Sequence, residues 1–383
     1  MKVLLPAIAL ALLVSLPGCG GGRERVWQHV IDLGGNEIAT GLTSDGTNFY
    51  VGATTTKDDH SSWLVTKLSK DGKEIWTRVY KDAPYSVCED VAADSTGACY
   101  AVGRVKPADK LACLVIKYGY DGSIAWQKGL ELGEKSWGMG ITLVGKDKIA
   151  VCGVAGTDAN ADHMVALLNA KDGSTIWSRN YDMCPVDLAR HIAADAKGNL
   201  AVVGQRDLGN QPDIVVFKLG PNGDTLWTRV YDSGGKDEAG DIAFDPFGNV
   251  LVTGTAVVGD SVRCVVLEYD PNGGVIRKEA YGQQTQAEGR GIYVNESSDI
   301  FVAGRLHVGV KQGEKAPHTE IIVFQYNPTA RWVWERQYSP GGDAGGVDLV
   351  VPNDAYVLAN VANKTEDAVV YRFSRPPVPK PAQ

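Results

Sequence analysis

The 383-residue sequence lacks the short motifs that mark the common catalytic chemistries. It contains no G-x-S-x-G nucleophile elbow, no H-E-x-x-H zinc motif and no glycine-rich loop that would hold a phosphate. It also has no C-x-x-C pair and no group of cysteines and histidines with the spacing of a zinc site. These absences predict a protein that is not an enzyme and that uses no cofactor.

The chain also lacks an apolar run long enough for a membrane span, because the run at its start, Val3 to Leu16, is too short. With Met1 and Lys2 before it, this run is typical of a secretory signal. The residues Leu16-Pro17-Gly18-Cys19 resemble a bacterial lipoprotein lipobox, which implies cleavage before Cys19 and acylation of its thiol. Plain secretion remains the alternative.

These features predict the domain organisation. We expect a lipoprotein signal peptide at 1–18, a short tether at 19–24, one domain at 25–374 and a disordered proline-rich tail at 375–383. The protein would then be a monomer in the bacterial cell envelope, anchored to a membrane by its N-terminal lipid, on the periplasmic side or on the cell surface.

A strong basic patch is missing as well. The chain has 38 Lys and Arg against 46 Asp and Glu, a formal charge of −8, with no basic concentration that would favour nucleic acid. Of seven cysteines, six remain after Cys19, and an even number in an exported protein permits disulfides. Most of the six fall inside predicted strands, which favours buried single thiols. They are Cys88, Cys99, Cys113, Cys152, Cys184 and Cys264.

What the sequence does have is an internal repeat of about 50 residues. A tryptophan near the end of each copy marks it, and Arg277 fills the same place in one copy. A second marker, a small or β-branched residue followed by glycine, recurs with the same period, as in Val102-Gly103 and Val203-Gly204. The tryptophans are Trp27, Trp76, Trp126, Trp177, Trp227 and Trp334. Together the markers indicate seven copies.

Each copy predicts four short strands, which in one copy are His191–Ala194, Leu200–Val203, Ile214–Leu219 and Thr225–Tyr231. Asp195–Gly198 and Pro221–Gly223 have the composition of tight hairpin turns, so the copy is an antiparallel meander. Consecutive apolar residues in the third strand indicate that both faces of the sheet are covered. Seven such sheets predict an all-β fold, a seven-bladed β-propeller of four-stranded antiparallel blades.

The two ends of the chain predict how the ring closes. Arg25–Gly35 aligns with Thr225–Gly235, so the domain begins with a lone fourth strand. At the other end, Gly346–Val350, Tyr356–Ala359 and Ala368–Phe373 supply three strands and no fourth. We therefore expect the N-terminal strand to pair with the last blade, which removes an exposed sheet edge.

Copies of the form D-V/I-A-x-D-x-x-G-N-x-x-V-x-G followed by K-L/Y-x-x-N/D-G-x-x-x-W-T-R-x-Y resemble the bacterial SBBP repeat family. The resemblance implies an exported β-propeller and no particular activity. Variable loops on a rigid scaffold, together with the missing catalytic motifs, favour a binding or scaffold module for an envelope protein or a glycan. The copies are also similar to quinoprotein-type propeller repeats, which leaves two alternatives: an envelope assembly factor of the barrel-assisting kind, or a quinone- or metal-dependent enzyme. Blade number and repeat length depart from that second pattern.

Binding residues are expected where the copies differ, on the face that carries the variable loops. One such loop is Thr54–Ser61. On the same face, the start of the innermost strand gives the series Gly41, Asp90, Gly140, His191, Asp241, Gly291 and Gly346, preceded by Thr40, Glu89, Met139, Arg190, Gly240, Arg290 and Gly345.

The charged members of these series, with His191, are the candidate ligand-binding residues at the mouth of the central channel. They are Glu89, Asp90, Arg190, His191, Asp241 and Arg290. In one interpretation they hold a cation or a polar ligand, and whether they bind a metal stays unknown. In the other they form hydrogen bonds to neighbouring blades.

Two further features are candidates for contact with a partner. Trp137 begins an innermost strand where other copies have small or polar residues, so it either stacks on a sugar or partner side chain or simply packs. The segment Leu306–His318 is the longest variable loop, and its candidate contacts are His307, Lys311, Lys315 and His318. A solvated loop without a partner is the alternative.

Overall fold

The computed structural model describes residues 25–374 except 108–109, 131–132, 158–159, 208, 210, 282–285, 310–316, 330–331 and 363–364. The predictions for the signal peptide, Cys19, the tether and the tail therefore lie outside the described residues. The described residues form strands and no helix, which confirms the all-β class. No described helix is long and apolar enough to cross a membrane.

The strands follow one another as hairpins. In chain order they are β1 (Arg25–Ile31), β2 (Asn36–Ser44), β3 (Asn48–Lys57), β4 (His60–Ser69), β5 (Glu74–Val79), β6 (Ser86–Ala93), β7 (Cys99–Val105), β8 (Ala112–Tyr118), β9 (Ile124–Leu130), β10 (Lys135–Val144), β11 (Lys148–Gly156), β12 (Ala161–Asn169), β13 (Thr175–Tyr181) and β14 (Val186–Ala194). They continue as β15 (Leu200–Asp207), β16 (Pro212–Leu219), β17 (Thr225–Tyr231), β18 (Asp237–Phe244), β19 (Val250–Val258), β20 (Ser261–Tyr269), β21 (Val275–Tyr281), β22 (Gln286–Val294), β23 (Ile300–Val308), β24 (His318–Tyr326), β25 (Trp332–Tyr338), β26 (Asp343–Val350), β27 (Ala355–Ala362) and β28 (Glu366–Phe373).

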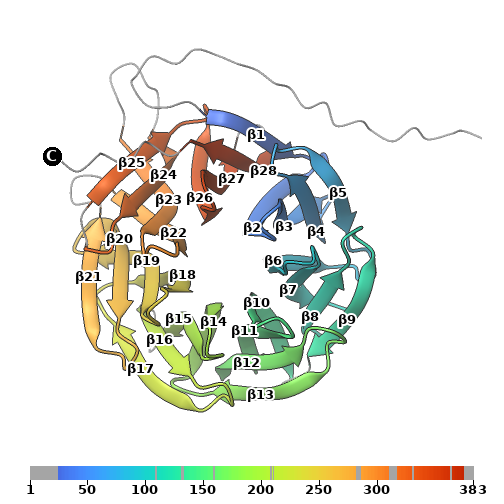
Figure 1. Ribbon diagram of the computed structural model, residues 1–383, viewed down its shortest axis with the longest axis horizontal. Helices are drawn as coiled ribbons and strands as arrows, with labels where there is room; N and C mark the ends of the chain where they lie inside the picture. The colour runs from blue at the N-terminus through green and yellow to red at the C-terminus, as the bar shows by residue number, and fades with distance from the viewer. Residues whose placement is uncertain are drawn as a thin grey trace, which may run out of the picture.

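These strands form sheets that stand side by side around a central opening (Figure 1). Five of the sheets have four strands each, and the sixth has eight. The eight-stranded sheet consists of the meanders β10–β13 and β14–β17, joined by a single parallel pair, Ala161 with Val186. Within every meander the neighbouring strands are antiparallel, as the repeat predicts.

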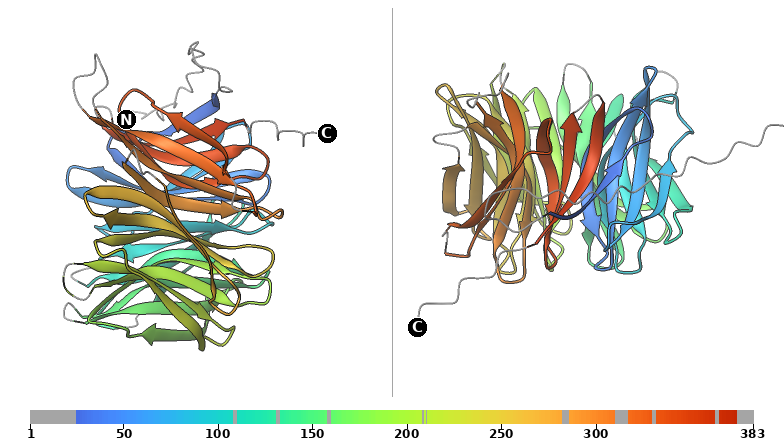
Figure 2. Two further views of the ribbon diagram at one scale, coloured as in Figure 1. Left: turned by 90° about the vertical axis from the view of Figure 1, so that its left-hand side faces the viewer. Right: turned by 90° about the horizontal axis from the view of Figure 1, so that it is seen from above.

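The N-terminal strand belongs to the sheet of the last three strands, in the order β1-β28-β27-β26. The register runs from Arg25 opposite Phe373 to Ile31 opposite Ala368. The predicted pairing of the first strand with the last sheet is therefore confirmed. Figure 2 shows the blue first strand lying across the red strands of the C-terminal sheet.

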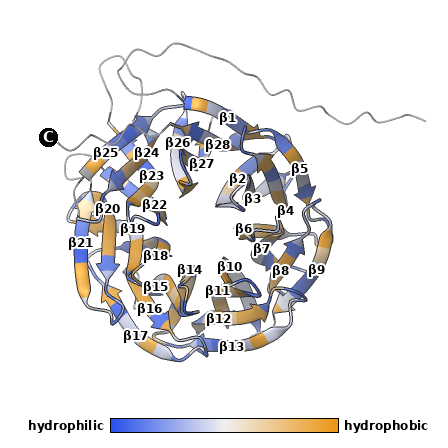
Figure 3. Ribbon diagram, viewed as in Figure 1, coloured by the Kyte–Doolittle hydropathy of each residue, from blue (hydrophilic) through white to orange (hydrophobic). Residues whose placement is uncertain are grey.

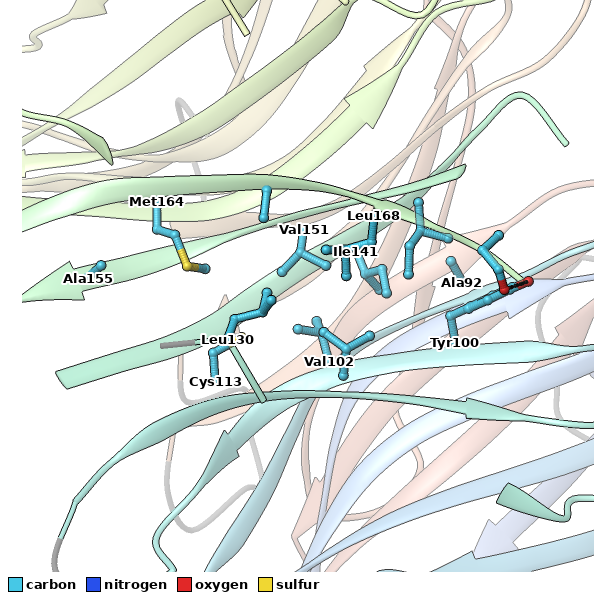
Figure 4. Packing of buried hydrophobic residues seen from close by; sticks show 14 of the residues in the cluster. Ala92, Tyr100, Val102, Cys113, Leu130, Ile141, Val151, Ala155, Met164 and Leu168 are labelled. Atoms are coloured by element: carbon cyan, nitrogen blue, oxygen red, sulfur yellow. Dashed lines mark hydrogen bonds between the residues drawn. The ribbon is translucent and has the colours of Figure 1, made fainter. Parts of the chain in front are cut away.

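The hydrophobic core is divided among the spaces between sheets. Figure 3 shows the apolar residues concentrated in strands such as β12, β16 and β20, which are covered on both faces. In one of these spaces, Val102 and Cys113 of one sheet pack against Ile141, Val151 and Met164 of the next (Figure 4). Each sheet is thus stabilised by its two neighbours, as expected for stacked repeats that cannot bury an apolar face alone.

The repeated residues join each sheet to the next, as the sequence predicts. The Trp227 indole donates to the Pro271 carbonyl at 3.1 Å, and the Arg229 guanidinium donates to the Gly273 carbonyl at 2.6 Å. The hairpin glycine Gly223 has a φ of +82°, the backbone conformation predicted for this turn. The six cysteines of the described chain are buried and free, which confirms the interpretation as single thiols.

Several predicted boundaries are wrong. The predicted loop Leu306–His318 is shorter than expected, because β23 extends to Val308 and β24 begins at His318. The innermost strand β14 begins at Val186 and not at His191, because a β-bulge between Ala189 and His191 interrupts the apolar pattern without ending the strand. The predicted loop Thr54–Ser61 is mostly strand. Only Asp58 and Asp59 separate β3 from β4, and both have the positive φ of a two-residue hairpin turn.

Candidate functional site

Every innermost strand carries a β-bulge near its start, and the residues around it form the candidate site. In β6 the register shifts between Cys88 and Asp90, so Glu89 has no partner on β7. The residue opposite the bulge is Gly103, where a Cβ would overlap the Val87 carbonyl. The same close approach occurs at Gly153, Gly204 and Gly304. In these four meanders the glycine that marks the repeat leaves the room that the bulge needs, whereas Ala359 stands opposite the bulge of β26.

The bulged residues line a cavity of about 400 Å³ at the end of the ring where the innermost strands begin. Each innermost strand contributes one of them: Thr40, Glu89, Met139, Arg190, Gly240, Arg290 and Val347. His191, Arg305 and Asn360 also line it. Of the predicted channel-mouth residues, the structure thus places Glu89, Arg190, His191 and Arg290 around one cavity.

The last strand of the series corrects the sequence alignment. The bulge in β26 lies between Gly346 and Asp348, so Val347 is the bulged residue and Asp348 follows it. The alignment of Gly345 and Gly346 with these positions was therefore wrong by two residues, and it missed Asp348. The signal was available, because Asp348-Leu349 matches Asp241-Ile242 and Asp90-Val91 in sequence.

The three aspartates that follow a bulge join neighbouring sheets. One carboxylate oxygen of Asp348 accepts from the next backbone N–H in its own strand, Leu349, at 2.7 Å. The other accepts from Leu42 in the adjacent sheet, also at 2.7 Å. Asp90 bonds Val91 and Ile141 in the same way, and Asp241 bonds Ile242 and Ile292. These contacts are those of the second interpretation, in which the carboxylates bond to neighbouring sheets.

The residues that follow the bulges form an inner ring around the axis: Gly41, Asp90, Gly140, His191, Asp241, Gly291 and Asp348. Its glycines lie next to residues of the ring that have larger side chains. A Cβ on Gly41 would lie 2.6 Å from the Asp90 carboxylate, and a Cβ on Gly291 would lie 2.7 Å from the Asp348 backbone. A Cβ on Gly140 would lie 2.9 Å from the Cα of His191. The ring therefore cannot hold a side chain at every position.

Burial controls the charges in the inner ring. It raises the pKa of Asp241 and of Asp348, and the charge of Asp241 raises that of Asp348 further. Burial also lowers the pKa of His191 to about 4, against the attraction of Asp348. His191 Nδ1 lies 3.6 Å from an Asp241 carboxylate oxygen, and at neutral pH this is a contact of a neutral imidazole.

The inner ring does not gather three ligand groups around one point. Among the described residues, two groups of His, Cys, Asp or Glu have all their ligand atoms within 4.8 Å of one another, and both lie elsewhere. They are Asp32 with Glu37 and Asp367, and Asp213 with Asp232 and Asp237. The structure brings His191 close to Asp241 but does not bring Asp90 into such a group with them.

The guanidinium groups of the cavity differ in their partners. Arg290 is neutralised by Glu288 at 2.6 Å and lies 3.8 Å from Glu238. Glu89 pairs with Arg104 at 3.1 Å. Arg190 donates its Nε to the neutral amide oxygen of Gln205 at 2.9 Å.

Arg305 was not predicted from the sequence. It projects from β23, and the Cβ position of Gly345 would lie 2.6 Å from its Nε. Neither Arg190 nor Arg305 forms a direct ion pair with a carboxylate of the described chain. The charges of Glu89 and Glu238 still act on Arg190, and that of Glu288 acts on Arg305 from the opposite position of the register.

The remaining candidates lie apart from this cavity. Trp137 is half-buried in β10 and is not among the residues that line it. His307 and His318 line a second cavity of about 650 Å³, where His307 contacts Glu288 at 2.8 Å and His318 contacts Glu320 at 3.1 Å. Lys311 and Lys315 lie outside the described residues.

Comparison with solved structures gives the class of fold. The β-propeller domain of the Trilobed protease from Pyrococcus furiosus superposes with a TM-score of 0.53 at 8% identity, over 90% of this chain and 97% of that chain. Sqt1 from Chaetomium thermophilum, bound to the N-terminus of the ribosomal protein L10, gives 0.53 at 12%, over 92% and 100%. A polysaccharide lyase, an ulvan lyase bound to a saccharide, gives 0.55 at 10%, over 88% and 92%.

These similarities, together with the ring of sheets, identify the protein as a β-propeller. Because the identities are low, the similarity concerns the fold, and the solved structures include both an enzyme and a binding protein. No protein-family model matches the chain, and no curated protein matches it either.

Proposed function

We propose that the protein is an exported, lipid-anchored binding module whose seven-bladed propeller recognises an acidic segment of an envelope protein at the channel-mouth cavity. The observation that carries the proposal is the pair of guanidinium groups, Arg190 and Arg305, that line a cavity of about 400 Å³ without a direct ion pair to a described carboxylate. A guanidinium binds a carboxylate through two parallel hydrogen bonds, and Arg is the usual residue at such sites.

The blade count of seven is supported by the strand pairing. Among the described residues, the two meanders of the eight-stranded sheet share one ladder contact, the parallel pair of Ala161 and Val186, and we therefore count them as two blades. With β1 completing the last sheet, all the strands then fall into four-stranded blades. The lipid anchor is supported by the sequence around Cys19.

A binding role agrees with the hydrogen bonds and charges of the other polar groups in the inner ring. The carboxylates of Asp90, Asp241 and Asp348 already accept backbone N–H groups, and His191 is held neutral by burial. These residues support the ring. Arg190 and Arg305, which have no direct ion pair among the described residues, remain available to a ligand and offer recognition by charge and hydrogen bonds.

An acidic protein segment fits the lining better than a glycan does. Sugar rings usually stack on aromatic side chains, and the cavity lining within the described part of the chain contains none. Ile38, Met139 and Val347 supply its apolar surface. The combination of an apolar floor and unpaired guanidinium groups suits a peptide that carries carboxylates beside aliphatic side chains.

Fluorescence anisotropy with a labelled hexaglutamate peptide tests this proposal. The wild-type protein should bind the peptide, and Arg305→Ala should weaken binding about tenfold through the loss of a charge-assisted contact. Arg179→Ala is the matched control, since Arg179 is exposed and pairs with Asp224 outside the cavity. Added salt should weaken binding to the wild-type protein.

Two results would contradict the proposal. One is peptide binding that Arg305→Ala and Arg190→Ala both leave unchanged. The other is an absence of peptide binding together with tight binding of trigalacturonic acid in the same assay, which would replace the protein partner by an acidic glycan.

A further inference from the structure

Two groups of three carboxylates occupy equivalent places in different repeats. Ile31 of β1 pairs with Ala368 of β28. Asp32 comes directly after Ile31 in the chain, and Asp367 comes directly before Ala368. In the same way, Tyr231 of β17 pairs with Ile214 of β16. Asp232 comes directly after Tyr231, and Asp213 comes directly before Ile214. Glu37 and Asp237 begin the next innermost strands. We call these groups the closure triad (Asp32, Glu37, Asp367) and the Arg206 triad (Asp213, Asp232, Asp237).

The Arg206 triad is satisfied by its own chain. Arg206 lies opposite Asp213 in the register and contacts its carboxylate at 3.0 Å. Ser233 donates both its backbone N–H, at 2.8 Å, and its hydroxyl to the carboxylate of Asp237. A cation and two hydrogen-bond donors are therefore built into this junction.

The closure triad lacks both of these partners. The residue opposite Asp367 is Val361, a buried apolar side chain, where the other triad has Arg206. The counterpart of Ser233 is Leu33, which has no hydroxyl. The Lys57 ammonium lies 3.7 Å from the Cβ position of Gly34 on this loop, but among the described residues it forms no ion pair with the triad.

Because the closure triad lacks these partners, the hydrogen bonds of the Glu37 carboxylate are incomplete. Its side chain is 0% exposed, and one carboxylate oxygen accepts from the Thr55 hydroxyl at 2.6 Å. The other oxygen, Oε2, has no hydrogen-bond partner among the described residues. A buried carboxylate needs a counter-charge or donors, since its desolvation is otherwise uncompensated.

We infer that the closure triad binds a divalent cation of the Ca²⁺ type. One carboxylate oxygen from each residue lies within 4.8 Å of the others, and two oxygens that both contact a Ca²⁺ ion at about 2.4 Å can be no farther apart than about 4.8 Å. The donor set consists of oxygen atoms alone, which Ca²⁺ prefers and Zn²⁺ does not. Water completes the coordination.

The position of the triad gives the ion a structural role. Asp32 lies on the connection from β1 to β2, Glu37 on β2 and Asp367 on β28. A bound ion therefore ties the first strand, the last strand and the first complete sheet together at the place where the ring closes. Without the ion, three carboxylates repel one another across this seam.

Thermal unfolding of the mature protein, with calcium chloride and with EDTA, tests the inference together with calorimetric titration of calcium chloride. Calcium should raise the melting temperature by about 3 °C or more at saturating concentration, because it binds only the folded state. Glu37→Gln should abolish this dependence and Asp32→Asn should weaken calcium binding at least about tenfold. Asp32 is exposed, so its variant keeps the test valid if Glu37→Gln fails to fold.

Asp232→Asn, in the Arg206 triad, is the matched control and should leave the calcium dependence intact. The inference is overturned if the wild-type protein shows neither a calcium-dependent melting temperature nor heat of binding. It is also overturned if Asp232→Asn removes the calcium effect while Asp32→Asn retains it.

Discussion

The outer rim and the inner ring of the propeller are built from the same repeat, but they tolerate variation differently. At the rim, the indoles of Trp76, Trp126, Trp177 and Trp227 each donate to a backbone carbonyl 44 residues further along the chain. In the inner ring, the equivalent positions hold Asp, Gly or His. A neutral donor and a backbone acceptor can be copied in every sheet. Close to the axis, identical charged side chains would meet and repel one another.

The inner ring therefore varies for structural reasons before it varies for function. The residue after a bulge is an aspartate that bonds two sheets in three strands and a glycine that leaves room for its neighbour in three others, and it is His191 in β14. The bulged residue just before it makes no contact that recurs around the ring. This second position, occupied by Glu89, Arg190 and Arg290 among others, is where a ligand specificity can change without loss of the fold.

The rim also has an exception that preserves its chemistry. Arg277 replaces the tryptophan in β21, and Glu268 replaces the lysine that stands opposite that tryptophan in three other sheets. Both side chains are buried, and they contact each other at 3.2 Å. A pairwise replacement has thus kept a polar contact at this point of the rim.

The largest expected effect comes from filling the space opposite a bulge. Gly204→Ala places a Cβ against the Leu188 carbonyl, and backbone atoms cannot move aside without breaking the ladder. We expect a loss of about 4 kcal/mol in the free energy of unfolding, measured by urea titration. Gly129→Ala in the outer strand β9 is the control, since a Cβ there has nothing within 4 Å. Equal losses of unfolding free energy in the two variants would contradict the view that the inner strands tolerate less variation than the outer strands.

Much of the fold could be predicted because the repeat imposes one local pattern on every copy. The Trp227 position, the Gly223 turn and the closure by β1 all follow from aligning copies with one another. The inner ring was harder to predict, because each bulge adds a residue to one strand only. The added residue shifts the alignment of the repeat copies at the position of the site. Asp348 was missed for this reason, and Arg305 was missed because it lies on a second strand and enters the cavity only through the fold.

The second prediction concerns the pH dependence of stability in the inner ring. The pKa of Asp348 is raised in the folded state, so this state binds a proton that the unfolded state releases, and stability falls as pH rises from about 4 to about 7. The pKa of His191 is lowered to about 4, so the unfolded state binds the extra proton and stability falls as pH decreases from 6.5 towards 4. The two groups oppose each other.

Single variants should separate the opposing contributions. His191→Gln should remove the loss of stability on the acid side, a change of about 2 kcal/mol near pH 4 relative to pH 7. Asp348→Asn should reduce the loss between pH 4 and pH 7, although Asp90 and Asp241 retain part of it because burial raises their pKa values too. Urea titrations at several pH values measure both slopes. Parallel profiles for wild type and both variants would contradict the assignment of these charges.

The smallest expected effect is at the rim, where a single hydrogen bond can be isolated. Trp227→Phe removes the indole N–H that donates to the Pro271 carbonyl at 3.1 Å, while an aromatic ring still packs at the junction. Trp27→Phe in β1 is a close match, because the Trp27 indole N–H is buried without a partner among the described residues. Both variants make the same change of side chain, so the hydrogen bond that only Trp227 makes should cost Trp227→Phe about 1 kcal/mol more. Urea titration measures both variants. If instead Trp27→Phe is the more destabilising of the two, the stability of the closing blade depends on the packing of Trp27 against Gly72 and Tyr356. The repeated tryptophans would then stabilise different blades by different contacts.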